Sequence, residues 1–217
     1  MLPRRFDATR ISSSQNIDRT VSAYMACKRA HKLLVIDIYT AWVLEKLRQV
    51  SKHTPNMDWP EIRVFAAHGP YKRLNAKQDY FGEFRNRLFR HRVTRDELKS
   101  TPEAFLYSGK ISSAPLIDEF KNAAAKVNVI YSQWQGYLDG NRNNCPGSDR
   151  IAAYRADPNV NFVYAHTSGH ATIEDLKRLS EALSPRQLIP IHTEHGEDFS
   201  KFFADVRAVE DGMIIKL

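Results

Sequence analysis

The chain has 217 residues, of which 42% are apolar and 26% are charged, as in an ordinary globular protein. No apolar run approaches the ~18 residues that a membrane-spanning helix needs, so the sequence predicts no membrane span. Residues 1–10 carry charge without a following apolar segment, which argues against a signal peptide. The two cysteines are too few for a disulfide framework, and a cytoplasmic location is therefore expected.

The charge is distributed unevenly along the chain. Residues 1–100 contain 20 Lys and Arg against 10 Asp and Glu, whereas residues 101–217 contain 12 against 15. A basic half favours contact with a polyanion, so RNA or DNA is the predicted partner. Solubility alone is the simpler interpretation of the same excess.

Apolar runs rich in Val and Ile alternate with helical patterns, which predicts an α/β fold. In chain order, the predicted elements are a helix over 16–30, a strand over 33–38, a helix over 40–50, a strand over 62–66 and a helix over 79–92. Short strands over 104–107 and 127–131 flank a helix over 115–125. The Gly- and Asn-rich segment 136–148 is predicted to be a loop and carries the predicted domain boundary.

The last third has the clearest pattern. A strand over 161–165 precedes a helix over 172–183, whose start at Thr172 has the form of a capping box. A strand over 187–191, a short helix and a final strand over 212–217 follow.

Basic and aromatic residues alternate in the helix predicted over 79–92. Arg85, Arg87 and Arg90 are interleaved with Phe84 and Phe89, a composition typical of surfaces that hold a nucleic-acid backbone. These three arginines are the predicted phosphate-binding residues of the basic half. A solvated basic helix face is the alternative.

Two histidine-rich turns, 166–170 and 192–194, follow predicted strands. In α/β sheets, functional groups gather outside the carboxyl ends of the strands. The first turn also leads into a helix, so the amides of Ser168 and Gly169 are placed to face an anion. Histidines in such turns donate protons or bind metals, whereas an isolated histidine is more often a surface or core residue. The pair His192 and His195 is a weaker candidate for a shared metal.

Two other classes of enzyme are disfavoured by missing motifs. Ser108-Gly109 lacks the Gly-x-Ser-x-Gly elbow of a serine nucleophile. A doubly wound nucleotide-binding enzyme is disfavoured because no Gly-x-Gly-x-x-Gly or Walker-type loop follows any predicted strand.

The two turns carry a resemblance to a known family. His166-Thr-Ser-Gly-His-Ala, then a helix, then Pro185-x-x-x-Ile-Pro-Ile-His192-Thr-Glu194 resembles the end of metallo-β-lactamase proteins of the β-CASP type, such as ribonuclease J and the cleavage and polyadenylation endonuclease. Those proteins read Ser-Gly-His or Ser-Ala-His, a helix, an apolar strand and His-Gly-Glu; here Thr193 replaces the glycine. Ser13-Ser-Gln-Asn-Ile-Asp-Arg19, Val35-Ile-Asp-Ile-Tyr-Thr40 and Tyr131-Ser-Gln-Trp-Gln-Gly136 look like parts of the β-CASP insertion.

The resemblance implies a fold and its domains. Residues 1–140 are expected to form a Rossmann-like β-CASP cap domain. Residues 141–217 are expected to form the C-terminal part of a metallo-β-lactamase αββα sandwich. Because the rest of that sandwich is not found in the sequence, we expect the last third to leave an apolar face exposed.

The resemblance also implies roles for individual residues. His170 corresponds to the histidine that contacts the scissile phosphate and protonates the leaving group, and His192 corresponds to a zinc ligand. His166, Ser168 and Gly169 correspond to residues that line the phosphate site. In a separate role, Glu194 orients the turn that carries His192. The complete family site holds two zinc ions, which activate water for attack on a phosphodiester.

One departure from the family outweighs these matches. The family's main metal motif, His-x-His-x-Asp-His, is absent from the 217 residues. Two zinc ions need about seven to eight protein ligands, and this chain offers one matched ligand. The resemblance therefore implies part of a nucleic-acid phosphodiesterase that is inactive alone, completed by a missing N-terminal half or a partner chain. A non-catalytic module that binds nucleic acid or a partner is the alternative.

Overall fold

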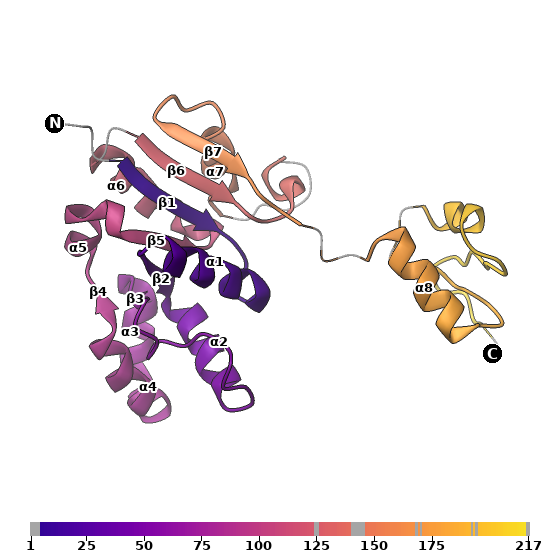
Figure 1. Cartoon of the computed structure of the whole chain (residues 1–217), viewed down its shortest axis with the longest axis horizontal. Helices are drawn as coiled ribbons and strands as arrows, with labels where there is room; N and C mark the ends of the chain where they lie inside the picture. Colours follow the sequence, from indigo (N-terminus) through magenta and orange to yellow (C-terminus); the bar gives the residue numbers. More distant parts are fainter. Residues whose placement is uncertain are drawn as a thin grey trace. The chain divides into compact units, whose positions relative to one another are not determined.

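Seven strands form one parallel sheet in the order β4-β3-β2-β5-β1-β6-β7 (Figure 1). The computed structural model describes residues 5–123, 126–139, 146–167, 169, 171–191, 193 and 195–215. The strands are β1 (Arg5–Ile11), β2 (Leu33–Asp37), β3 (Ile62–Phe65), β4 (Arg92–Val93), β5 (Phe105–Gly109), β6 (Lys126–Tyr131) and β7 (Val160–Tyr164). The chain divides into two compact units, Met1–Thr167, which contains the sheet, and Ser168–Leu217.

Helices connect the strands of the first unit. They are α1 (Ile17–Arg29), α2 (Ile38–Arg48), α3 (His68–Ala76), α4 (Gln78–Arg90), α5 (Arg95–Ser100), α6 (Ala114–Ala123) and α7 (Ser148–Ala153), with 3₁₀ turns η1 (Pro102–Ala104), η2 (Ile111–Ser113) and η3 (Gln135–Leu138). The side chain of Asn16 caps α1 by accepting from the Arg19 amide at 3.0 Å, and Asp37 caps α2 by accepting from the Thr40 amide at 2.6 Å. Each cap satisfies an amide that the first helical turn leaves unpaired.

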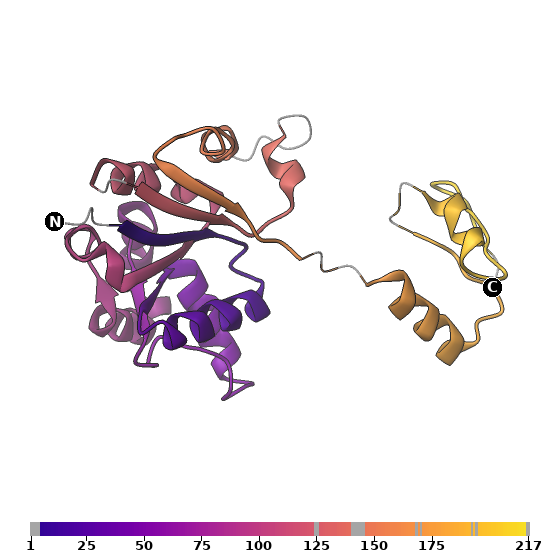
Figure 2. The same ribbon diagram turned by 45° about the horizontal axis from the view of Figure 1, so that its top comes forward.

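Both faces of the sheet are covered by helices (Figure 2). Alternate residues of β2 show this directly, because Val35 lies in one hydrophobic core and Leu34 and Ile36 lie in the other. The first core includes residues from α5, α6 and α7, and the second includes residues from α1, α2, α3 and α4. A parallel sheet buried on both faces explains the continuous apolar runs in the sequence. The mixed α/β architecture confirms the predicted fold class.

The order of the strands creates a change of direction inside the sheet. The connections that leave β1, β2 and β3 run toward the β4 edge, whereas those that leave β5 and β6 run toward the β7 edge. Strands β2 and β5 are neighbours, and their connections leave in opposite directions. Ligands of open α/β sheets bind at such a switch point, outside the carboxyl ends of the strands.

The second unit contains α8 (Ile173–Leu183) and the 3₁₀ helix η4 (Gly196–Lys201). Thr172 caps α8 as predicted, accepting from the Asp175 amide at 3.2 Å. Taken by itself, the unit buries none of its described residues, and Leu179, Leu183 and Ile191 are 55%, 67% and 80% exposed. The unit's own side chains therefore do not enclose an apolar core.

Several predicted elements differ from the structure. The predicted strands over 187–191 and 212–217 are wrong for the described residues, where only an isolated bridge between Leu188 and Val206 forms. A strand needs a paired neighbour, and the second unit provides no sheet for these segments to join. Elements β1, α3, β4, α5 and α7 were not predicted. The sheet also continues through β7, beyond the predicted boundary at residue 140.

None of the helices in the described part of the chain is long and apolar enough to cross a membrane.

Candidate functional site

The carboxyl ends of β5, β1, β6 and β7 meet at one edge of the sheet. The Ser12 amide donates to the Gly109 carbonyl at 3.0 Å, and the Ser132 amide donates to the Ile11 carbonyl at 2.8 Å. The Ala165 amide donates to the Tyr131 carbonyl at 3.0 Å. These bonds extend the sheet past its regular strands and place His166 immediately beyond the end of β7.

Of the three histidines assigned to the phosphate and zinc site, His166, His170 and His192, His166 alone is among the described residues. Its side chain is half-buried, and its Nδ1 atom is buried without a hydrogen-bond partner. Burial lowers the pKa of His166, and the positive charge of Arg19 lowers it further. The imidazole is therefore held neutral at neutral pH, and a neutral imidazole keeps one ring nitrogen unprotonated as a hydrogen-bond acceptor.

Arg19, in the first turns of α1, binds the chain on both sides of this site. Its guanidinium donates to the Ser132 carbonyl after β6 and to the Thr167 carbonyl beside His166. One side chain thus joins α1 to the ends of two strands. Arg19 ends the segment 13–19 that resembles the β-CASP insertion, but the sequence does not predict this role, because the two partners lie 113 and 148 residues away.

Arg10 is a buried cation that was not predicted as a site residue. It lies in β1, is 7% exposed, and donates to the Ser108 hydroxyl at 3.0 Å and to the Arg19 carbonyl. Its Nε atom is buried without a partner. Burial lowers the pKa of Arg10 to about 10, with Arg19 contributing in the same direction. The signal in the sequence was a charged residue inside the run Ala8-Thr9-Arg10-Ile11.

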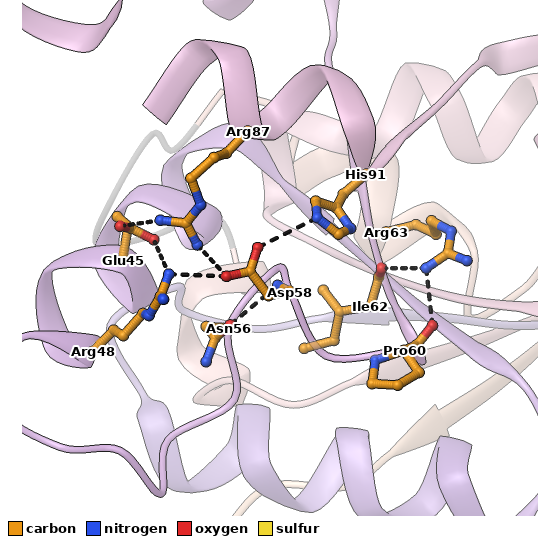
Figure 3. A network of polar contacts seen from close by, with 9 residues as sticks. All are labelled: Glu45, Arg48, Asn56, Asp58, Pro60, Ile62, Arg63, Arg87 and His91. Atoms are coloured by element: carbon orange, nitrogen blue, oxygen red, sulfur yellow. Dashed lines mark hydrogen bonds and ion pairs between the residues drawn. The ribbon is translucent and has the colours of Figure 1, made fainter. Parts of the chain in front are cut away.

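The predicted phosphate-binding arginines occupy α4 with different surroundings. Arg87 is largely buried and pairs with Glu45 and Asp58, each at 2.5 Å, in the network of Figure 3. Arg85 donates to the Asn75 side chain at 2.7 Å, whereas Arg90 is exposed. Helix α4 leads into β4 at one edge of the sheet, and His166 follows β7 at the other. The structure therefore does not bring these arginines and His166 together.

The network around Arg87 has a structural role that charge composition does not reveal. Asp58 also accepts from Arg48 at 2.9 Å and lies 3.3 Å from His91 Nε2 (Figure 3). It binds α2, α4 and the loop before β3 into one polar cluster. The positive charge of Arg87 is consequently balanced by carboxylates.

The remaining predicted site residues can be placed only in part. Ser168, His170, His192 and Glu194 lie outside the described residues. Gly169 is exposed, and a Cβ atom built on it meets nothing within 4 Å among the residues that the structure describes.

The described residues do not build a metal centre. Among them, no group of three or more His, Cys, Asp or Glu side chains is arranged to hold a metal ion. The predicted ligand His192 is not among the residues that this finding covers.

Comparison with known families identifies the segment that carries both histidine turns. Residues 159–201 match the model of the Zn-dependent metallo-hydrolase RNA specificity domain. A comparison with curated proteins gave no match. The match over residues 159–201 confirms the resemblance of this segment to the metallo-β-lactamase-family, β-CASP-like hydrolases.

Proposed function

We propose that this chain forms part of a zinc-dependent hydrolase that cleaves RNA phosphodiester bonds. The match of residues 159–201 to a Zn-dependent metallo-hydrolase RNA specificity domain carries the proposal. The matched segment contains the turns 166–170 and 192–194, which hold every histidine and the glutamate assigned to the site. RNA is therefore preferred to DNA as the substrate.

Within this proposal, each residue has a chemical task. His192 is a zinc ligand held in orientation by Glu194, and His170 donates a proton to the leaving oxygen. Ser168 and Gly169 contribute to the phosphate site with His166, whose neutral imidazole has an unpartnered Nδ1 atom. Zinc, when bound, supplies a Lewis acid that lowers the pKa of a water molecule toward neutrality.

The described residues by themselves do not fit a site for two zinc ions. One matched ligand is far from the about seven to eight that two ions need. We therefore propose that the other ligands come from a polypeptide segment that carries His-x-His-x-Asp-His, and that the 217-residue chain is inactive without it. A cytoplasmic location is retained as part of the proposal.

The test compares the purified chain with a complete assembly. The chain alone is expected to keep well under one zinc per molecule after dialysis and to leave labelled RNA intact with zinc or manganese present. Fusion to, or mixing with, a family segment that carries His-x-His-x-Asp-His should restore both metal binding and cleavage. Stoichiometric zinc and metal-dependent cleavage by the chain alone would contradict the proposed dependence on a second segment. RNA binding without restored cleavage would favour a non-catalytic binding module.

A further inference from the structure

A cavity of about 830 Å³ lies at the switch point of the sheet, within the first unit. Its walls include Asp37 and Phe65, the last residues of β2 and β3, and Lys110, which follows β5. Helices α2, α3, α4 and α6 supply most of the remaining lining. Its volume lies within the ~300–1,000 Å³ of small-molecule sites, and its position is where open α/β sheets bind ligands.

The wall on the side of α2 and α4 is aromatic. Trp42 lines the cavity and makes edge-on contacts with Phe81 and Phe84, at ring-centroid distances of 4.8 and 4.9 Å. Tyr39, at the start of α2, also lines the cavity and is 43% exposed. Rings fixed by edge-on packing leave an apolar wall suited to a flat ring system.

The cavity also has an excess of positive charge. Two of its cations are balanced, because Arg95 pairs with Glu119 at 2.9 Å and Lys110 lies 3.6 Å from Asp37. Arg73 and Lys77, near the end of α3, have no ion-pair or side-chain hydrogen-bond partner in the described part of the chain. These two side chains leave about two positive charges, which matches the charge of about −1.5 to −2 on a phosphate monoester at neutral pH.

Hydroxyl groups of Tyr107 and Ser113 also line the cavity. The Tyr107 hydroxyl lies 3.1 Å from the Ser113 hydroxyl, and burial raises the pKa of Tyr107 far above its usual range. It therefore remains a neutral donor. A Cβ atom on Gly109 would lie 2.6 Å from both the Ser113 oxygen and the Tyr107 ring, so only glycine allows this close approach.

We infer that this cavity binds a nucleotide, with the base against the aromatic wall and the phosphate held by Arg73 and Lys77. An inorganic anion leaves the aromatic wall unused, and an uncharged apolar ligand leaves two cations without a partner. The ligand is either a free mononucleotide or the 5′-terminal nucleotide of an RNA strand, since both present the same chemistry. The inference goes beyond the proposed hydrolysis because no residue of the two histidine turns lines the cavity and nucleotide binding there needs no zinc.

Isothermal titration calorimetry on the full chain at fixed ionic strength tests the inference. The probes are adenosine 5′-monophosphate, adenosine, inorganic phosphate, and one short oligonucleotide with and without a 5′-phosphate. The variant Arg73→Gln with Lys77→Gln is expected to weaken binding of the monophosphate at least about tenfold, the loss of a charged hydrogen bond to phosphate. The matched control, Lys52→Gln with Lys72→Gln, removes the same charge from exposed sites outside the cavity and should change affinity less than about twofold.

The probes also identify the source of the nucleotide. Tighter binding of the 5′-phosphorylated oligonucleotide than of the monophosphate indicates a strand end, and the reverse indicates a free nucleotide. If inorganic phosphate binds as tightly as adenosine 5′-monophosphate, the inference is overturned, because the aromatic wall then contributes nothing to the affinity. Absence of binding by both phosphorylated probes, or unchanged affinity in the double variant, also overturns it. Thermal unfolding of each variant establishes that the fold is retained.

Discussion

The guanidinium of Arg10 lies 3.0 Å from the hydroxyl of Ser108, between neighbouring strands β1 and β5. No carboxylate in the described part of the chain pairs with this buried cation, and its Nε atom has no partner. Burying a charge without an opposite charge costs free energy, which agrees with the lowered pKa of Arg10. Arg10 therefore orders the strand ends at the expense of stability.

Replacing Arg10 with methionine is expected to leave the free energy of unfolding unchanged or to increase it by about 1–2 kcal/mol. The physical reason is that an apolar side chain of similar length removes the cost of burying the charge, while the hydroxyl of Ser108 loses one donor. Chemical denaturation of the wild type and Arg10→Met measures the difference. A decrease of more than about 2 kcal/mol would show that the hydrogen bonds of Arg10 outweigh its desolvation.

Capping residues in the sequence were sufficient to locate the start of two helices, α1 and α8. They are Asn16 before α1 and Thr172 before α8, and each side chain accepts from an amide three residues later. The predicted start of α2 at Thr40 was two residues late, because the capping residue is Asp37, inside the predicted strand. Helix α3 was missed because Gly69 and Pro70, which favour loops, occupy its first turn.

The candidate sites differ in how far the sequence can reveal them. The two histidine turns are visible because their residues are close in sequence and follow strand patterns. The nucleotide cavity depends on the parallel pairing of β2 with β5, which brings Asp37 near Lys110. No local pattern encodes that pairing, and the glycine motifs used to recognise dinucleotide sites are absent. The carboxylate partners of Arg87 could not be predicted either, because no local pattern encodes a contact with Glu45, which lies 42 residues away.

The arginines of α4 are expected to differ in RNA binding. Arg90 is exposed and is therefore available to contact one phosphate of a single-stranded RNA. Arg90→Gln should then reduce the slope of log affinity against log salt concentration by about 0.7. Arg87→Gln should leave the slope unchanged and instead lower the free energy of unfolding by about 1–3 kcal/mol, because Glu45 and Asp58 each lose one cationic partner. Fluorescence anisotropy at several salt concentrations, with denaturation of each variant, separates the two outcomes. A flatter slope for Arg87→Gln would show that Arg87 leaves its carboxylates to bind RNA.

His166 is expected to make stability depend on pH. Its pKa in the folded protein is lowered from the ordinary value of 6.5, so the unfolded chain binds a proton at a higher pH than the folded chain does. The free energy of unfolding should therefore fall as the pH decreases from about 7.5 to 5.5. The stabilisation contributed by neutral His166 is fully present only above pH 6.5. In His166→Gln, the free energy of unfolding should fall less over this pH range than in the wild type. In the control His53→Gln, at an exposed position, it should fall as much as in the wild type. Equal pH dependence in both variants would assign the effect to other groups.

The last prediction separates the roles of His170 and His192 in an assembly that contains the His-x-His-x-Asp-His segment and cleaves RNA. His192→Ala should lose zinc together with activity, because it removes a metal ligand, and a metal-deficient site cannot activate water at neutral pH. His170→Ala should retain zinc and lose rate by roughly 10²–10⁴-fold, the contribution typical of a general acid. An RNA with an activated leaving group, which needs no protonation, should recover much of the rate in His170→Ala but none in His192→Ala. Metal analysis of both variants and single-turnover cleavage of both substrates provide the measurements. Loss of zinc from His170→Ala, or full zinc content in His192→Ala, would reverse the assignment of the two histidines.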